Sequence, residues 1–163
     1  MDRRDFLRAA GLGVAFGALP RVADAQQGGR AQPRAAALPT LTVYKSQYCG
    51  CCHQWVDHVK AAGFPVRTID TEALASVKAE MGVPRQLESC HTVVAGNYLV
   101  EGHVPAADIK RMLAEKPAIR GIAVPGMPIG SPGMEQGPVS GYQKYEVIAF
   151  TAAGRTSVYA RHG

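Results

Sequence analysis

The chain has 163 residues, of which 18 are Lys or Arg and 13 are Asp or Glu, so its formal net charge is +5. With 47% hydrophobic and 19% charged residues it has a globular composition, which argues against a disordered chain. Its length suits one domain with its own core, and no apolar run reaches the ~18 residues of a membrane span. The small basic excess is spread along the chain, so it predicts no nucleic-acid partner.

The N-terminal region has the pattern of an export signal. The apolar run Ala9–Pro20 precedes an Ala-Asp-Ala sequence at 23–25 and follows three arginines, Arg3, Arg4 and Arg8. A basic start, a short apolar middle and an A-x-A ending are typical of a cleaved secretory signal. The paired arginines indicate the twin-arginine type. We therefore expect residues 1–25 to be a signal peptide and the mature protein to be periplasmic, with no membrane attachment after cleavage.

The mature chain begins with residues 26–39, where Gly, Gln, Pro and Ala dominate, which predicts a flexible leader before a folded domain at 40–163. The β-prone run 41–44 predicts the first strand of that domain. Trp55, Val56 and Val59 share one face at helical spacing, which predicts a helix over 55–62 that ends at Gly63.

The next elements continue the alternation of strands and helices. Residues 64–69 predict a strand, and a helix follows with Asp70 or Thr71 as its cap, Gly82 at its end and a buried side formed by Leu74, Val77 and Met81. The Gly96-Asn97 pair predicts a hairpin of strands 91–95 and 98–101. Pro105 opens a helix that stops near Pro117. The order β-α-β-α-β-β-α predicts an α/β, thioredoxin-like fold, with helices on both faces of a central sheet.

Two features extend this arrangement toward the C-terminus. Residues 120–141 form a Gly- and Pro-rich stretch that carries Met127 and Met134, and a loop of this length without its own elements is usually functional. Strands at 145–150 and 156–159, joined through Ala153-Gly154, predict a C-terminal β-hairpin.

Three of the four cysteines lie within four residues, Cys49-Gly50-Cys51-Cys52, between the first strand and the first helix. In a thioredoxin-like fold a C-x-x-C pair caps this helix, and the helix N-terminus favours thiolate over thiol. Cys49 and Cys52 have that spacing. Cys90 begins the strand that faces this motif in such folds. It stands in a Ser-Cys-His sequence where a redox enzyme normally carries a cis-proline edge.

Four sulfurs at one helix end favour a thiolate-rich metal site, since soft thiolates select Cu(I), Zn(II) or iron–sulfur clusters. The adjacent Cys51 and Cys52 can serve neighbouring Cu(I) ions, whereas one tetrahedral zinc prefers spaced pairs of ligands. The thioethers of Met127 and Met134 are also compatible with copper. Two alternatives stay open, a redox-active Cys49/Cys52 dithiol and a pair of inert structural disulfides.

Four motifs, in this order, resemble the exported CopG-type copper-resistance proteins, a family formerly described as a domain of unknown function. The likeness covers roughly residues 41–150. The motifs are C-G-C-C at 49–52, S-C-H-T at 89–92, E-G-H-V-P-A at 101–106 and G-M-P-I-G-S-P-G-M-E at 126–135.

The resemblance implies a thioredoxin-like fold that holds a thiolate-bridged, multinuclear Cu(I) cluster in periplasmic copper homeostasis and resistance. It implies Cys49, Cys51, Cys52 and Cys90 as copper ligands. It leaves open whether the protein only binds copper or also changes its oxidation state, and other periplasmic copper-handling proteins are expected partners. The different class of function that we weigh is a thiol–disulfide oxidoreductase using Cys49 and Cys52, and zinc is the alternative metal.

Four further side chains are candidates for auxiliary contacts with the metal or with its ligands: His91, His103, Met127 and Met134. His91 adjoins Cys90, and His103 precedes the third helix, where packing or capping is the competing role. The two methionines are candidates for copper contact or for a lid over the cluster. We expect His58 and His162 to lie at the surface.

Overall fold

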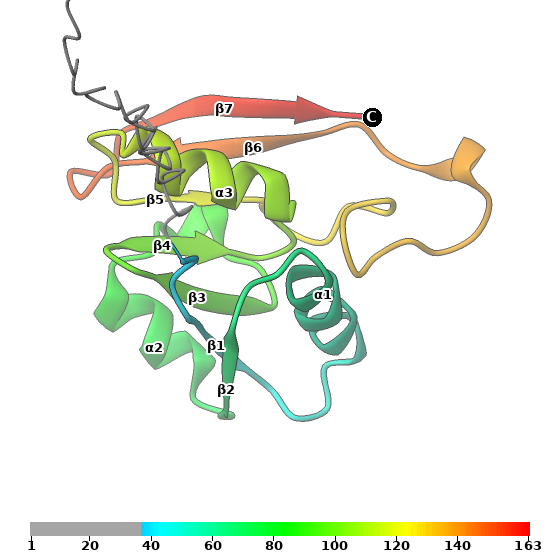
Figure 1. Ribbon diagram of the computed structural model, residues 1–163, viewed down its shortest axis with the longest axis horizontal. Helices are drawn as coiled ribbons and strands as arrows, with labels where there is room; N and C mark the ends of the chain where they lie inside the picture. The colour runs from blue at the N-terminus through cyan, green and yellow to red at the C-terminus, as the bar shows by residue number, and fades with distance from the viewer. Residues whose placement is uncertain (1–36) are drawn as a thin grey trace, which may run out of the picture. The chain divides into compact units, whose positions relative to one another are not determined.

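The computed structural model describes residues 37–163, so the expected signal peptide and most of the expected leader lie outside the described residues. The described part contains a seven-stranded sheet in the order β2-β1-β3-β4-β5-β6-β7 (Figure 1). The strands are β1 (Leu41–Lys45), β2 (Val66–Asp70), β3 (His91–Ala95), β4 (Tyr98–Glu101), β5 (Gly121–Ala123), β6 (Tyr145–Phe150) and β7 (Thr156–His162). The helices are α1 (Gly50–Ala61), α2 (Leu74–Met81) and α3 (Ala106–Glu115), with short 3-10 turns at Arg85–Leu87 and Val139–Gly141. No helix in this range is long and apolar enough to span a membrane.

Strand pairing places the ends of β1 and β3 side by side. Strand β1 pairs in parallel with β2 and antiparallel with β3, and Lys45 at the end of β1 lies opposite His91 at the start of β3. Strands β3 and β4 form the predicted antiparallel hairpin. The predicted order from β1 to α3 is therefore confirmed, and the segments that flank these two strand ends meet at one edge of the sheet.

Both faces of the sheet are covered by helices or loops. Neighbouring residues of each strand point to opposite sides, so each strand contributes to both packed faces. On one face Val93 and Val100 pack with side chains of α1 and α3, among them Trp55 and Ile109. On the other face lie Leu99, Ala123 and Phe150, together with residues that follow α2, Val83 and Leu87. Helices α1 and α3 thus share one side of the sheet, and α2 with the segment after it covers the other (Figure 1).

The starts of two helices differ from the sequence predictions. Helix α1 begins at Gly50, five residues earlier than expected, because Cys49 acts as its N-cap and accepts the Cys52 N–H at 3.3 Å. Neither Asp70 nor Thr71 caps α2: the N-cap is Ala73, and the Thr71 hydroxyl instead accepts the Ala73 N–H at 3.0 Å. Its C-terminus at Gly82 is confirmed, with the left-handed backbone (φ 76°) that glycine adopts readily.

The Gly- and Pro-rich stretch is not entirely a loop. Its first residues form β5, which pairs in parallel with β4 and antiparallel with β6, and so connects the C-terminal hairpin to the rest of the sheet. The hairpin itself is confirmed, although β7 runs to His162 rather than to Tyr159. All three residues of β5 are buried, and the strand was missed because three residues are too few to show a periodic pattern.

His58 was expected at the surface, but it is half-buried and caps another helix. Its Nε2 accepts the N–H of Ala106 at 3.1 Å, at the start of α3, whose own N-cap Pro105 makes no side-chain hydrogen bond. His162 is also half-buried, with Nε2 2.6 Å from Asp108 of the same helix. The two histidines therefore join α1 and β7 to the first turn of α3.

The His58 cap predicts a pH-dependent contribution to stability. Burial lowers the pKa of His58, and Glu135 opposes this effect. The Nε2 atom can accept the hydrogen bond from the Ala106 N–H only when the ring is neutral. An unfolded histidine takes up its proton near pH 6.5. Because the unfolded chain then binds more protons than the folded chain, stability falls as the pH drops below about 6.5.

We expect His58→Gln, which retains a neutral acceptor, to reduce this pH dependence. The measurement is the free energy of unfolding in urea at about pH 7.5 and about pH 5.5 for both proteins. Other buried histidines titrate in both proteins, so only the difference between the two proteins in the change of unfolding free energy with pH reports on His58. The same change in both proteins would contradict the role of His58 as a neutral cap.

Candidate copper site

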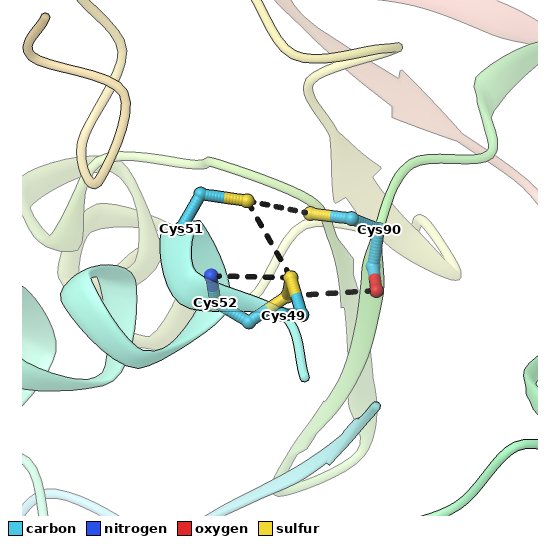
Figure 2. A group of neighbouring side chains, drawn as sticks. All are labelled: Cys49, Cys51, Cys52 and Cys90. Carbon is cyan, nitrogen blue, oxygen red and sulfur yellow. Dashed lines mark hydrogen bonds between the residues drawn. A yellow bond between two sulfur atoms is a disulfide. The ribbon is translucent and has the colours of Figure 1, made fainter. Parts of the chain in front are cut away.

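All four cysteines meet where the N-terminus of α1 faces the segment before β3 (Figure 2). Their sulfur atoms lie within 4.8 Å of one another. The Sγ of Cys51 is 3.4 Å from that of Cys49 and 3.8 Å from that of Cys90. Cys52 is buried and the other three are half-buried. The expected approach of Cys90 to the triplet is therefore present.

The cysteines are not all thiols in this form of the protein. Cys49 and Cys52 form a disulfide, while Cys51 and Cys90 are free. The described residues contain one disulfide, whereas the alternative of inert structural disulfides required two. The bonded pair has the C-x-x-C spacing of a redox motif. A disulfide sulfur lacks the negative charge of a thiolate, so a site with four thiolates requires reduction of this bond.

Two histidines complete the surroundings of Cys90. Its Sγ lies 2.9 Å from His103 Nε2 and 3.4 Å from His91 Nδ1, and ligand atoms of these three residues lie within 4.8 Å of one another. The Nδ1 of His103 is 2.8 Å from the carbonyl oxygen of Pro132. A carbonyl only accepts, so Nδ1 carries the proton and the lone pair of Nε2 points at Cys90. Sulfur and neutral imidazole together suit copper or zinc.

His91 is fully buried between two rings. Its centroid lies 4.6 Å from that of Trp55 and 5.1 Å from that of His103. Among the described residues, its Nε2 is the one buried side-chain nitrogen or oxygen without a hydrogen-bond partner. Native structures leave few buried polar atoms unsatisfied, and a metal ligand is one explanation for such an atom.

Burial sets the protonation of these groups. It lowers the pKa of His91, with His103 and Lys78 adding to the effect, and it also lowers the pKa of His103, so both rings are neutral at pH 7. Burial, with the neighbouring Cys51 adding to it, raises the pKa of the Cys90 thiol to about 12. Because a metal binds the thiolate, a metal held by Cys90 would displace this proton.

The methionine-bearing loop packs on the cysteine helix through Gly133. A Cβ at this position would lie 2.7 Å from both Cys51 O and Trp55 N, and the backbone has φ +82°. Residues 131–133 are buried, Met134 is half-buried, and Met127 is 52% exposed. The loop therefore lies against α1, and its Pro132 orients His103, whereas copper contact by either methionine stays a hypothesis.

A buried ion pair that the sequence did not predict supports the Cys90 segment from the other face of the sheet. Lys78 Nζ of α2 donates to Glu101 Oε1 at 2.5 Å and to Thr92 Oγ1 at 2.8 Å. Glu101 also accepts the Ser89 N–H at 2.7 Å and the Thr92 hydroxyl at 2.6 Å. Burial raises the pKa of Glu101, and Lys78 opposes this rise most. The carboxylate thus holds the residue that precedes Cys90.

A second lysine borders the site at the end of β1. Lys45 is buried, and its Nζ donates to Asp70 Oδ1 at 2.6 Å and lies 2.7 Å from His53 Nε2. Asp70 and Glu101 therefore both acquire lysine partners that are distant in the sequence. No periodic pattern indicates such pairs, because each joins residues from two different elements.

Comparisons with known proteins identify chains that are similar to this one. A family model described as "Protein of unknown function, DUF411" matches residues 87–134, a segment that includes Cys90 and Met134. The solved structure "Copper resistance protein copG- Form 1" is 43% identical, with a TM-score of 0.71, and the match covers 77% of this chain and 98% of that one. "Copper resistance protein copG- Form 2" is 44% identical, with a TM-score of 0.72, over 77% and 99% of the two chains. No curated protein matches.

This chain belongs to the CopG copper-resistance family. The expected family is therefore confirmed. Copper handling and a cysteine-rich site that can hold metal follow at this level, since the matched structures are copper-resistance proteins with a similar fold and the four cysteines of this chain converge.

The buried ion pair predicts a large loss of stability in Lys78→Met, because this change leaves Glu101 as an uncompensated buried charge. We expect the free energy of unfolding of the copper-free protein to fall by about 3–5 kcal/mol. Adding Glu101→Gln to Lys78→Met should restore part of the lost free energy of unfolding, because the buried carboxylate is then replaced by a neutral amide. The exposed Lys60→Met on α1 is the matched control and should change little. Chemical denaturation of the four proteins tests this, and equal stability of Lys78→Met and Lys60→Met would contradict the role of the pair.

The close approach of Gly133 to α1 predicts that Gly133→Ala destabilises the protein more than Gly137→Ala. Both residues have positive φ, 82° and 76°, so both alanine variants carry a conformational cost of about 1–2 kcal/mol. Only at Gly133 would the new Cβ also meet backbone atoms of α1, whereas nothing lies within 4 Å at Gly137. We expect about 1–3 kcal/mol of additional destabilisation from this overlap. Thermal unfolding measures the difference, and equal melting temperatures would show that the loop does not pack as described.

Proposed function

We propose that this chain is an exported periplasmic protein that binds Cu(I) in copper resistance, with Cys49, Cys51, Cys52 and Cys90 as ligands of a multinuclear thiolate cluster. The convergence of four sulfurs within 4.8 Å carries the proposal. Sulfurs this close to one another suit bridging between neighbouring Cu(I) ions, which prefer soft ligands. The cluster requires the reduced form of the Cys49–Cys52 pair.

The surrounding residues have supporting roles in this proposal. His103 and His91 offer neutral nitrogen atoms beside Cys90, so they can complete the coordination of a copper bound there. Met127 and Met134 belong to the loop that packs on α1, and we propose their thioethers as auxiliary contacts or as part of a cover. We also interpret the segment from β1 to α3 as a thioredoxin-like domain, on the basis of its element order and strand pairing.

The disulfide favours one second candidate, a thiol–disulfide oxidoreductase that uses Cys49 and Cys52. These residues form a C-x-x-C disulfide at a helix N-terminus, where thiolate is stabilised. The two functions make different demands on the other cysteines: a copper cluster needs Cys51 and Cys90, whereas dithiol exchange with an external substrate needs neither.

Metal titration distinguishes these functions. We expect the chain, reduced and handled without oxygen, to bind several Cu(I) ions in competition with a chromophoric Cu(I) chelator. Cys51→Ser and Cys90→Ser should each lower the number bound, because each removes a soft ligand, whereas the exposed Ser157→Ala on β7 should not. Unreduced protein, with two thiols in place of four, should bind fewer ions than reduced protein.

The opposite outcomes identify the alternatives. One zinc and no copper in the purified protein would favour a zinc site. Insulin reduction that survives Cys51→Ser and Cys90→Ser, in protein that does not bind Cu(I), would favour the oxidoreductase.

A further inference from the structure

The four sulfurs form a connected series in which the disulfide lies at one end. Cys52 is bonded to Cys49, Cys49 Sγ lies 3.4 Å from Cys51 Sγ, and Cys51 Sγ lies 3.8 Å from Cys90 Sγ (Figure 2). Cys51 is therefore a free thiol in contact with both the disulfide and the second free thiol. This is the arrangement that thiol–disulfide exchange requires, because a thiolate attacks a disulfide sulfur directly.

We propose that the copper-free protein carries out an internal disulfide relay, in which Cys51 transfers the disulfide from Cys49–Cys52 to Cys51–Cys90. The relay goes beyond copper binding, since it uses the same sulfurs but requires no metal. It also differs from a two-cysteine oxidoreductase, because Cys51 and Cys90 are its essential groups.

In the first step, the thiolate of Cys51 attacks Cys49 Sγ. A Cys49–Cys51 bond forms, the Cys49–Cys52 bond breaks, and Cys52 leaves with the electron pair. The proton lost by Cys51 to solvent is replaced on Cys52. Cys52 Sγ lies 3.7 Å from the carbonyl oxygen of Cys90, which can accept the hydrogen of the new thiol. Gly50, where an added Cβ would meet nothing within 4 Å, separates the two residues whose sulfurs join.

In the second step, Cys90 attacks Cys51 Sγ and Cys49 leaves. A Cys51–Cys90 bond forms between two sulfurs that lie 3.8 Å apart, the Cys49–Cys51 bond breaks, and Cys49 leaves with the electron pair. The proton of the Cys90 thiol is lost to solvent. The departing Cys49 sulfur accepts the Cys52 N–H, at 3.3 Å, at the N-terminus of α1, which makes it a good leaving group. Solvent then supplies the proton that Cys49 takes up.

The relay is redox-neutral, because the protein begins and ends with one disulfide and two thiols. What changes is which thiols are free. In the observed isomer the free thiols are Cys51 and Cys90, of which Cys90 lies beside His91 and His103. In the second isomer they are Cys49 and Cys52 at the helix N-terminus. A disulfide formed at one end of the series can thus move to the other end. In the second isomer, α1 is covalently linked to the segment before β3.

Tryptic peptides distinguish the two isomers. Cys49, Cys51 and Cys52 lie in one tryptic peptide, between Lys45 and Lys60, and Cys90 lies in another, between Arg85 and Lys110. Of the two isomers, the one with the Cys51–Cys90 bond therefore links two peptides, and the one with the Cys49–Cys52 bond does not. The copper-stripped full chain, in its one-disulfide form, is held at about pH 4, where thiol–disulfide exchange is slow, and then moved without oxygen to about pH 8, where exchange is faster. Samples are quenched with acid, alkylated and digested, and the linked pair is quantified by mass spectrometry.

We expect the linked peptide pair to appear in the wild-type chain over minutes to hours, at a rate independent of protein concentration, with two alkylated cysteines per chain throughout. Cys51→Ser should form no linked pair, and Cys51→Ala should behave in the same way. Both variants retain Cys49, Cys52 and Cys90, and circular dichroism checks that they fold.

Three outcomes would overturn the relay. The first is no linked pair in the wild type after hours at about pH 8. The second is a linked pair that forms equally fast in Cys51→Ser, which would show direct attack by Cys90. The third is a rate that rises with protein concentration, which would show exchange between chains. Because the experiment contains no copper, its failure leaves the copper titration unaffected, and the converse also holds.

Discussion

The antiparallel pairing of β1 with β3 is the constraint on which the site depends. Lys45, the last residue of β1, lies opposite His91, the first residue of β3. The chain therefore leaves β1 and enters β3 at the same edge of the sheet. The cysteine triplet follows the first of these points and Cys90 precedes the second, so that residues separated by 39 positions bring their sulfurs within 3.8 Å. A shift of register by one residue would turn His91 and Thr92 to the opposite faces.

The start of β3 joins two chemically different environments. His91 faces α1 and α3, where it contacts Trp55 and His103 among apolar side chains and a sulfur. Thr92 faces α2, where it belongs to the buried network of Lys78 and Glu101. The network is separated from the metal-binding face by one strand, but it holds the N–H of Ser89 and so positions the segment that carries Cys90. The buried ion pair on one face of the sheet thus helps to position the cysteine whose sulfur lies near the other face.

In the proposed cluster, copper binding and disulfide formation would compete for the same atoms. A sulfur in a disulfide cannot act as a thiolate ligand, so the Cys49–Cys52 bond leaves the site with Cys51, Cys90 and the two neutral imidazoles. This smaller set has mixed sulfur and nitrogen donors, whereas the reduced set has four sulfurs. Since Cu(I) prefers softer ligands, the redox state of the Cys49–Cys52 pair would determine how strongly the proposed site binds it. The close packing of the four sulfurs makes this coupling unavoidable.

The sequence alone determined the elements from β1 to α3, the hairpin turn at Gly96-Asn97 and the four cysteines as one site, because these depend on local periodicity, turn residues and motif order. Only the tertiary structure decided the Lys78–Glu101 pair, the cap that His58 provides for α3, and the bonding of Cys49 to Cys52. Each of these joins groups whose environment depends on how elements pack. Lys78 lies on the same helix as the partly buried Leu74 and Met81, and no local pattern indicates that a carboxylate 23 residues away will neutralise it.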